Sequence, residues 1–174
     1  MKAITKPYDL LPGVVSTAAL AEHWKLYEGY VAGVNAGAQP LEYQLGGVVM
    51  HELFFRGLSP KPTQAVLPVF QSLLAVDWGT VDAFWRELRA AAMDARGWAV
   101  LGYRASDKMR VLSMDEHDAG VLGYEPLIVI DCYEHAYFMD YGTRKAEYLD
   151  SLWKVFDWQE LEKRWSQMRA LRSL

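Results

Sequence analysis

The residue types best suited to chemistry in this chain are an aspartate and a histidine that follow a short apolar run. Residues 126–130 read Pro-Leu-Ile-Val-Ile, and Asp131 and His135 come directly after them, four residues apart. An apolar run of this length is typical of a buried strand, which delivers both side chains to one place at its end. A carboxylate oxygen and an imidazole nitrogen that face the same point are two ligands of a metal site.

The chain has four histidines, and the other three are His23, His51 and His117. Three histidines with one carboxylate suit iron, manganese or zinc. His23 and His51 fall on two helical segments that could pack as a hairpin. The alternative interpretation is that both are ordinary partly buried histidines and that Asp131 caps a following helix, a position that aspartate favours. Spacing alone leaves both interpretations open.

Sequence signals predict the helices that carry these histidines. Ser16 and Thr17 predict the N-cap of a helix that runs to about residue 35, in which His23, Tyr27 and Tyr30 share one face. Further helices are expected over residues 42–57, which carry His51, and over residues 63–74, 81–94, 144–156 and 158–169.

The pattern changes to that of strands in the middle of the chain. Residues 98–103 and 109–113 predict a hairpin with a polar turn at residues 104–108, and residues 127–131 predict a third strand. Helices, then strands, then helices favour an α+β fold class.

Prolines at positions 60 and 62 indicate a linker. We therefore predict an N-terminal helical hairpin domain over residues 1–60 and a C-terminal α/β domain over residues 61–174.

Composition narrows the functional classes. The chain has 174 residues, of which 52% are hydrophobic, so it can bury a substantial core. Its formal net charge of −4 argues against nucleic acid as a partner. Its one cysteine, Cys132, rules out an internal disulfide and fits a reducing compartment. No signal peptide or membrane-spanning run is evident, so we expect a cytoplasmic protein with no membrane partner.

Six stretches of the chain resemble the iron/manganese superoxide dismutase family. Asp131-Cys-Tyr-Glu-His-Ala-Tyr is similar to the family signature Asp-x-Trp-Glu-His-Ala-Tyr. The other similar stretches, in the family's order, are Lys6-Pro-Tyr-Asp-Leu, His23-Trp-Lys-Leu-Tyr-Glu-Gly-Tyr, His51-Glu-Leu-Phe-Phe-Arg-Gly-Leu, Arg96-Gly-Trp-Ala-Val-Leu and Arg144-Lys-Ala-Glu-Tyr-Leu.

The resemblance implies both a fold and an activity. The fold is an N-terminal α-helical hairpin against a C-terminal α/β lobe with a three-stranded antiparallel sheet, and the metal lies between the lobes. The metal ligands would be His23, His51, Asp131 and His135, which bind one iron or manganese ion per subunit. The activity is an oxidoreductase reaction, the disproportionation of superoxide to dioxygen and hydrogen peroxide.

The resemblance also implies roles around the metal. Tyr30 would stand at the substrate entrance, and Trp98 and Tyr133 would form an apolar wall. Arg144 would attract the anionic substrate. His117 falls where many manganese members carry a glutamine that hydrogen-bonds the metal's solvent ligand, so it is the candidate donor. Together, Tyr30, His117 and Arg144 are the expected catalytic residues.

Glu134 implies a second subunit, because in the family this glutamate reaches across a dimer interface to a ligand histidine. A homodimer is therefore expected, and a tetramer remains open.

Departures from the family pattern leave an alternative open. The spacing from His23 to Tyr30 is one residue short, so Glu22 competes for the first ligand position. Tyr27 replaces a further histidine of the substrate channel, and Phe138 replaces a tyrosine. The alternative to an efficient enzyme is a metal-binding protein of this fold with weak or altered redox activity.

Overall fold

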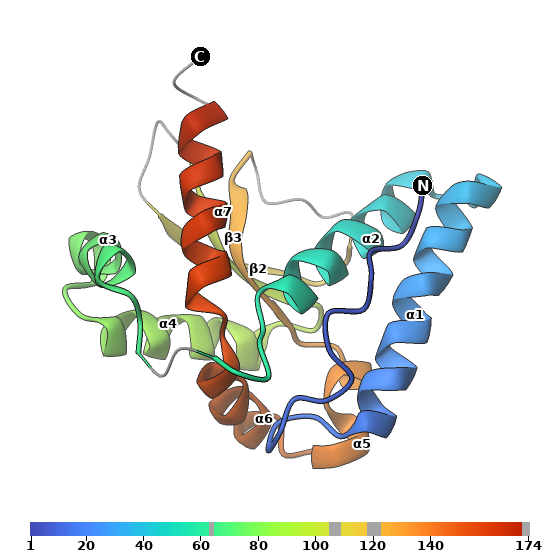
Figure 1. The fold of residues 1–174 in the computed structure, drawn as a ribbon, viewed down its shortest axis with the longest axis horizontal. Helices are drawn as coiled ribbons and strands as arrows, with labels where there is room; N and C mark the ends of the chain where they lie inside the picture. The colour runs from blue at the N-terminus through green and yellow to red at the C-terminus, as the bar shows by residue number, and fades with distance from the viewer. Residues whose placement is uncertain (63–64, 105–108, 118–122, 172–174) are drawn as a thin grey trace.

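The computed structural model describes residues 1–62, 65–104, 109–117 and 123–171 (Figure 1). The elements in chain order are α1 (Thr17–Ala36), α2 (Leu41–Arg56), α3 (Pro68–Trp78), α4 (Val81–Asp94), β1 (Trp98–Tyr103), β2 (Arg110–Met114), β3 (Glu125–Asp131), the 3-10 turn η1 (Glu134–Ala136), α5 (Phe138–Tyr141), α6 (Lys145–Leu152), the 3-10 turn η2 (Trp153–Val155) and α7 (Trp158–Leu171). This is the predicted α+β class, with an N-terminal helical region and a C-terminal domain built on a sheet.

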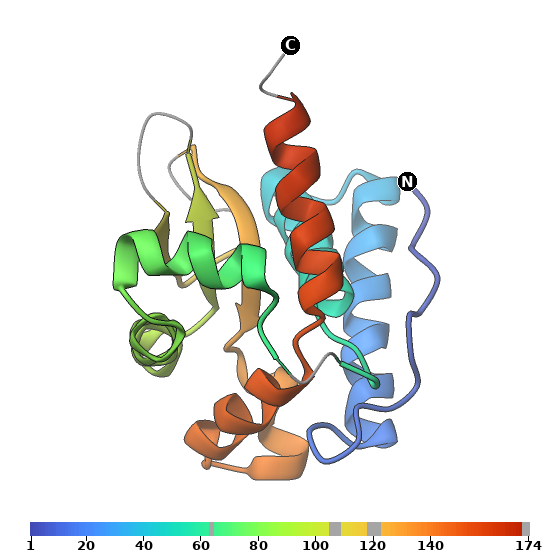
Figure 2. The same cartoon turned by 60° about the vertical axis from the view of Figure 1, so that its left-hand side comes forward.

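The sheet separates two groups of helices. Its strand order is β2-β1-β3, and both pairings are antiparallel. Helix α4 packs against β1 and β2, whereas α2 and α7 pack against β3. Figures 1 and 2 both place α1 and α2 on one side of the sheet and α3 and α4 on the other. Among the described helices, none is long and apolar enough to cross a membrane.

The register of the sheet explains why distant residues meet. Trp98, the first residue of β1, pairs with Asp131 at the end of β3 and with Met114 at the end of β2. These three strand termini therefore lie together at one end of the sheet. His117 follows Met114 by three residues, so it lies near this end as well.

Local sequence signals account for the boundaries of α1. The Ser16 side chain accepts a hydrogen bond from the Ala19 amide at 3.1 Å, as predicted for an N-cap. The helix ends at Gly37, whose φ of 67° is a left-handed conformation that glycine adopts without strain.

The predicted helix over residues 63–74 is wrong in its boundaries. Residues 63–64 lie outside the described part, residues 65–67 are not helical, and α3 begins only at Pro68. Proline suits the first helical position, and it holds the preceding Leu67 in an extended conformation. The predicted turn at residues 104–108 falls largely outside the described residues.

The predicted helix over residues 144–156 is also wrong, because it divides into α6 and η2. After α6 the backbone forms hydrogen bonds with the residues that follow α2. Val155 accepts a hydrogen bond from the Ser59 amide at 2.8 Å, and Asp157 donates one to Gly57 at 2.8 Å.

Arg164 on α7 ties α2 to the sheet. Its guanidinium donates to the Leu127 carbonyl of β3 at 2.8 Å and to the Leu53 carbonyl of α2 at 3.1 Å. Only 8% of Arg164 is exposed, and burial lowers its pKa to about 10. These bonds hold the helix that carries His51 against the strand that carries Asp131.

Candidate metal centre

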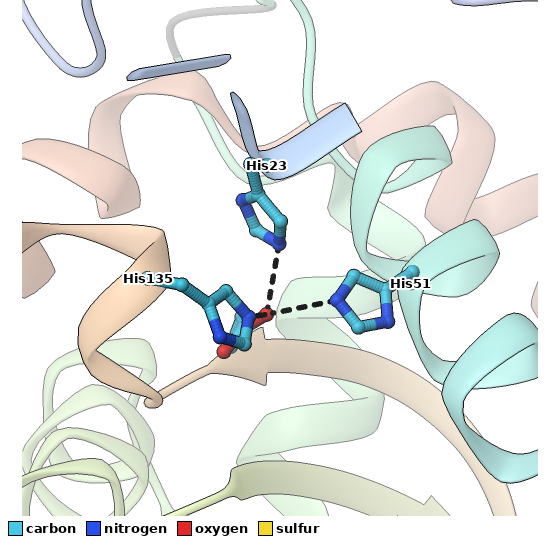
Figure 3. Close-up of side chains that lie close together, drawn as sticks. His23, His51 and His135 are labelled. Atoms are coloured by element: carbon cyan, nitrogen blue, oxygen red, sulfur yellow. Dashed lines mark hydrogen bonds and ion pairs between the residues drawn. The ribbon is translucent and has the colours of Figure 1, made fainter. Parts of the chain in front are cut away.

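Four side chains from separate elements converge at the end of β3. His23 comes from α1, His51 from α2, Asp131 from β3 and His135 from η1, and one potential ligand atom of each lies within 4.8 Å of the others. Figure 3 shows the three imidazoles pointing toward one another. The Asp131 Oδ2 atom lies 3.0 Å from Nε2 of His23, 3.0 Å from Nε2 of His135 and 3.6 Å from Nε2 of His51.

These distances fit a single metal ion. Ligand atoms about 2.1 Å from one ion lie roughly 3.0–3.4 Å from each other, which is close to the observed separations. The Nε2 atom of His51 is buried without a hydrogen-bond partner among the described residues. Its Nδ1 atom lies 2.6 Å from the Gly47 carbonyl, which can only accept, so the imidazole proton is on Nδ1. The lone pair of Nε2 therefore faces the cluster, as a metal ligand requires.

Electrostatics favour the metal-binding protonation state at three of the four side chains of the cluster. Burial alone would raise the pKa of Asp131, but His135 and His23 outweigh burial and hold that pKa well below its usual range. Burial lowers the pKa of His23, and it lowers the pKa of His51 to about 3. Burial opposes the charge on His135 too, but the Asp131 carboxylate prevails and raises its pKa. One anion thus faces two neutral imidazoles and, at His135, a third at which a metal ion would compete with a proton.

The backbone around Asp131 is fixed by two further hydrogen bonds. The Tyr133 amide donates to Asp131 Oδ1 at 3.0 Å, so this carboxylate also caps the turn that leads to His135. The Tyr148 hydroxyl donates to the Asp131 carbonyl at 3.1 Å from the buried side. Both interpretations of Asp131, cap and ligand candidate, are therefore compatible, because different carboxylate oxygens serve each.

Trp98, His117 and Tyr30 form a series of hydrogen bonds beside the four-residue cluster, and all donate in the same direction. The Trp98 indole donates to His117 Nδ1 at 3.0 Å, and His117 Nε2 lies 2.8 Å from the Tyr30 hydroxyl. An indole nitrogen can only donate, so a neutral His117 carries its proton on Nε2 and donates it to Tyr30. The hydrogen of Tyr30 is then left to donate onward.

Two adjacent glycines on α2 make room for this chain. A Cβ atom at Gly46 would lie 2.2 Å from the His117 carbonyl oxygen, and one at Gly47 would lie 2.7 Å from the Tyr30 ring. The close approach of His117 and Tyr30 to α2 therefore requires glycine at both positions.

Comparison with known proteins identifies the family. Residues 68–164 match the model of the iron/manganese superoxide dismutases, C-terminal domain. A manganese superoxide dismutase of Haloferax volcanii is 30% identical over 182 aligned residues, covering 92% of each chain. The chain belongs to the iron/manganese superoxide dismutase family.

Other relatives carry either metal in their names. An iron superoxide dismutase of Aquifex pyrophilus is 39% identical over 74% of this chain and 62% of its own length. The mitochondrial manganese superoxide dismutase of Schizosaccharomyces pombe is 29% identical over 90% of this chain and 82% of its own length. Membership makes this chain a superoxide dismutase, an oxidoreductase with an iron or manganese centre.

Some of the site residues predicted from the sequence lie at the cluster, and others lie on the surface. His23 is in the cluster and 3% exposed, whereas Glu22 is exposed and pairs with Lys25. Tyr30 and His117 lie together beside the cluster. Arg144 is exposed, and its guanidinium contacts Glu147 and donates to the Asp140 carbonyl.

Tyr27, which replaces a channel histidine of the family, is part of the core. It is fully buried, its hydroxyl donates to Glu52 at 2.8 Å, and it accepts a hydrogen bond from the Ile4 amide at 2.9 Å. The phenol therefore ties the N-terminal segment and α2 to α1.

Sequence reasoning missed two residues at the site. Tyr148 supports the backbone of Asp131, but no local sequence pattern predicts that contact. Tyr43, whose ring lies 4.7 Å from that of His117, had a detectable signal. It precedes Gly47 and His51 by four and eight residues, so all three share one helix face.

Proposed function

We propose that His23, His51, Asp131 and His135 hold one iron or manganese ion per subunit, and that superoxide is disproportionated there. The observation that carries the proposal is the convergence of three imidazoles and one carboxylate within 4.8 Å, with His51 Nε2 buried and without a hydrogen-bond partner among the described residues. One carboxylate with three neutral imidazoles suits a cation that changes between two and three positive charges. We take the boundary between the N-terminal and C-terminal domains near residue 60, so the ion would lie between them.

The surrounding residues would control substrate and protons. A bound iron or manganese ion supplies one-electron redox chemistry. Tyr30 orients its hydroxyl at the entrance, supported by the 2.8 Å contact with His117. His117, fixed by Trp98, keeps its proton on the side of Tyr30. The apolar rings of Trp98 and Tyr133 exclude bulk water from the buried cluster.

The test is to load the apoprotein separately with iron and with manganese. Metal content and superoxide consumption are then measured on each form. We expect about one ion per chain and rapid consumption with at least one metal. Stoichiometric metal with no consumption in either form would support the alternative, a metal-binding protein of this fold with altered redox activity.

Arg144 is the proposed source of attraction for the superoxide anion. The chain is negative overall, so attraction must be local, and the exposed guanidinium of Arg144 offers it. We expect Arg144→Gln to lower kcat/KM about two- to fivefold at low ionic strength and to flatten its dependence on salt. The control is Arg89→Gln, which removes a partly exposed guanidinium, paired with Asp150. Equal salt dependence in both variants would contradict this role.

Glu134 is the proposed residue of a homodimer interface. It is exposed and lines a hollow of about 450 Å³ beside His135, together with Arg96 and Lys145. We expect Glu134→Ala to weaken both self-association and metal retention, measured by sedimentation at several concentrations and by metal analysis. Glu162→Ala, a surface change on α7, serves as control. A Glu134→Ala protein that stays dimeric with full metal would contradict the proposal, and the same data would reveal a tetramer.

We propose a cytoplasmic location on the basis of Cys132. This single thiol is free and buried, and burial raises its pKa to about 12, which disfavours the reactive thiolate. With one cysteine the chain forms no internal disulfide, so it fits a reducing compartment.

A further inference from the structure

Tyr43 occupies a special place on the helix that carries His51. Tyr43, Gly47 and His51 are spaced by four residues, so they form one stripe along α2. Because Gly47 has no side chain, the ring of Tyr30 packs into the gap between the other two. Its ring centroid lies 6.1 Å from that of Tyr43 and 5.4 Å from that of His51.

Tyr43 also touches the second member of the hydrogen-bonded pair. Its ring lies 4.7 Å from the His117 ring at an interplanar angle of 64°, an edge-to-face contact. Both groups of the Tyr30–His117 hydrogen bond thus rest against one half-buried phenol. Burial raises the pKa of Tyr30, and the neighbouring phenol of Tyr43 raises it further.

The direction of the hydrogen bonds indicates how Tyr43 could affect Tyr30. Trp98 donates to His117 and His117 donates to Tyr30, so the Tyr30 hydroxyl has its own hydrogen left to donate. Without a fixed neighbour, that hydrogen could rotate about the phenol C–O bond. Tyr43 is the neighbour on the side of α2, and it limits both the position of the Tyr30 ring and the orientation of its hydroxyl.

We propose that Tyr43 is a positioning residue of the superoxide reaction, which holds Tyr30 and His117 where they meet the substrate. The proposal rests on the role assigned to Tyr30 above. Tyr43 acts through Tyr30 and requires no contact of its own with the substrate.

The first test is a double-mutant cycle. Tyr43→Phe removes only the hydroxyl, and we expect kcat to fall about fivefold, a part of the contribution of a positioned proton donor, while KM changes less than about twofold. Tyr30→Phe should cost more, and the double variant should be no slower than Tyr30→Phe alone. Additive losses would show that Tyr43 acts independently and would overturn the proposal.

The matched control is Tyr103→Phe, which changes a phenol at the opposite end of β1 from Trp98. It should keep the wild-type kcat. All variants should keep full metal content and melt within about 4 °C of the wild type, because one hydroxyl hydrogen bond contributes about 1 kcal/mol. A drop in kcat for Tyr103→Phe equal to that for Tyr43→Phe would also overturn the proposal.

The second test does not use activity. In zinc-loaded protein, with histidine labelled with ¹⁵N, the Nε2–H group of His117 should be protected from exchange with water by its bond to Tyr30. Tyr43→Phe should speed that exchange about tenfold or more, and Tyr103→Phe should leave it unchanged. Unchanged exchange in Tyr43→Phe would refute the positioning role. If wild-type protein consumed no superoxide, the proposed function would fail, while this measurement would still decide the role of Tyr43.

Discussion

Asp131→Asn is expected to produce a folded protein that loses its metal and at least about 99% of its superoxide consumption. The substitution conserves shape but removes the only anion among the four cluster residues, whose carboxylate is fully buried between imidazoles. An amide is a poor ligand for iron or manganese, and even changes outside the ligand set cost 10–100-fold in metal affinity or activity. Metal analysis, superoxide consumption and circular dichroism measure the outcome.

The control is Asp150→Asn, which removes a half-exposed carboxylate paired with Arg89. It should keep wild-type metal content and activity. Stoichiometric metal and normal turnover in Asp131→Asn would remove this carboxylate from the ligand set.

Gly46→Ala is expected to destabilise the protein by about 1–3 kcal/mol, although alanine favours helices more than glycine does. The added Cβ would lie 2.2 Å from the His117 carbonyl oxygen, and a backbone atom cannot rotate away as a side chain can. Either α2 or the segment that carries His117 must therefore move. We expect a fall in melting temperature of about 2–10 °C, measured by calorimetry, and a loss of kcat as His117 leaves Tyr30.

Gly29→Ala is the matched control for Gly46→Ala. Gly29 lies inside α1, and a Cβ there would meet no atom within 4 Å. Its substitution should raise stability by about 0.5–1 kcal/mol through helix propensity alone. Effects of the same sign at both positions would contradict the steric explanation.

The elements that carry the cluster were predictable because strong local signals mark them. Ser16 begins α1, the apolar run ahead of Asp131 forms β3, and Asp131 and His135 are close in sequence. His23 was harder to assign, because spacing alone left Glu22 in competition. Burial of His23 against an exposed Glu22 is a tertiary property that no local pattern contains.

The contacts that sequence reasoning did not reach are those between distant elements. The position of Tyr43 against His117 depends on how α2 packs against the segment that follows β2, and the bond from Trp98 to His117 depends on strand register. The predicted helix start at residue 63 is wrong, although Pro68 suits the first helical position. The separation of η2 from α6 depends on pairing with residues 57–59, which lie about a hundred positions earlier in the chain.

The position of Arg164 in the chain sets an order of events during synthesis. A ribosome completes His23, His51, Asp131 and His135 before it reaches Tyr148 and Arg164. Yet Tyr148 fixes the carbonyl of Asp131, and Arg164 joins the helix of His51 to β3. A nascent chain therefore has every candidate ligand well before it has the geometry that unites them. We therefore expect metal capture to follow the docking of α7.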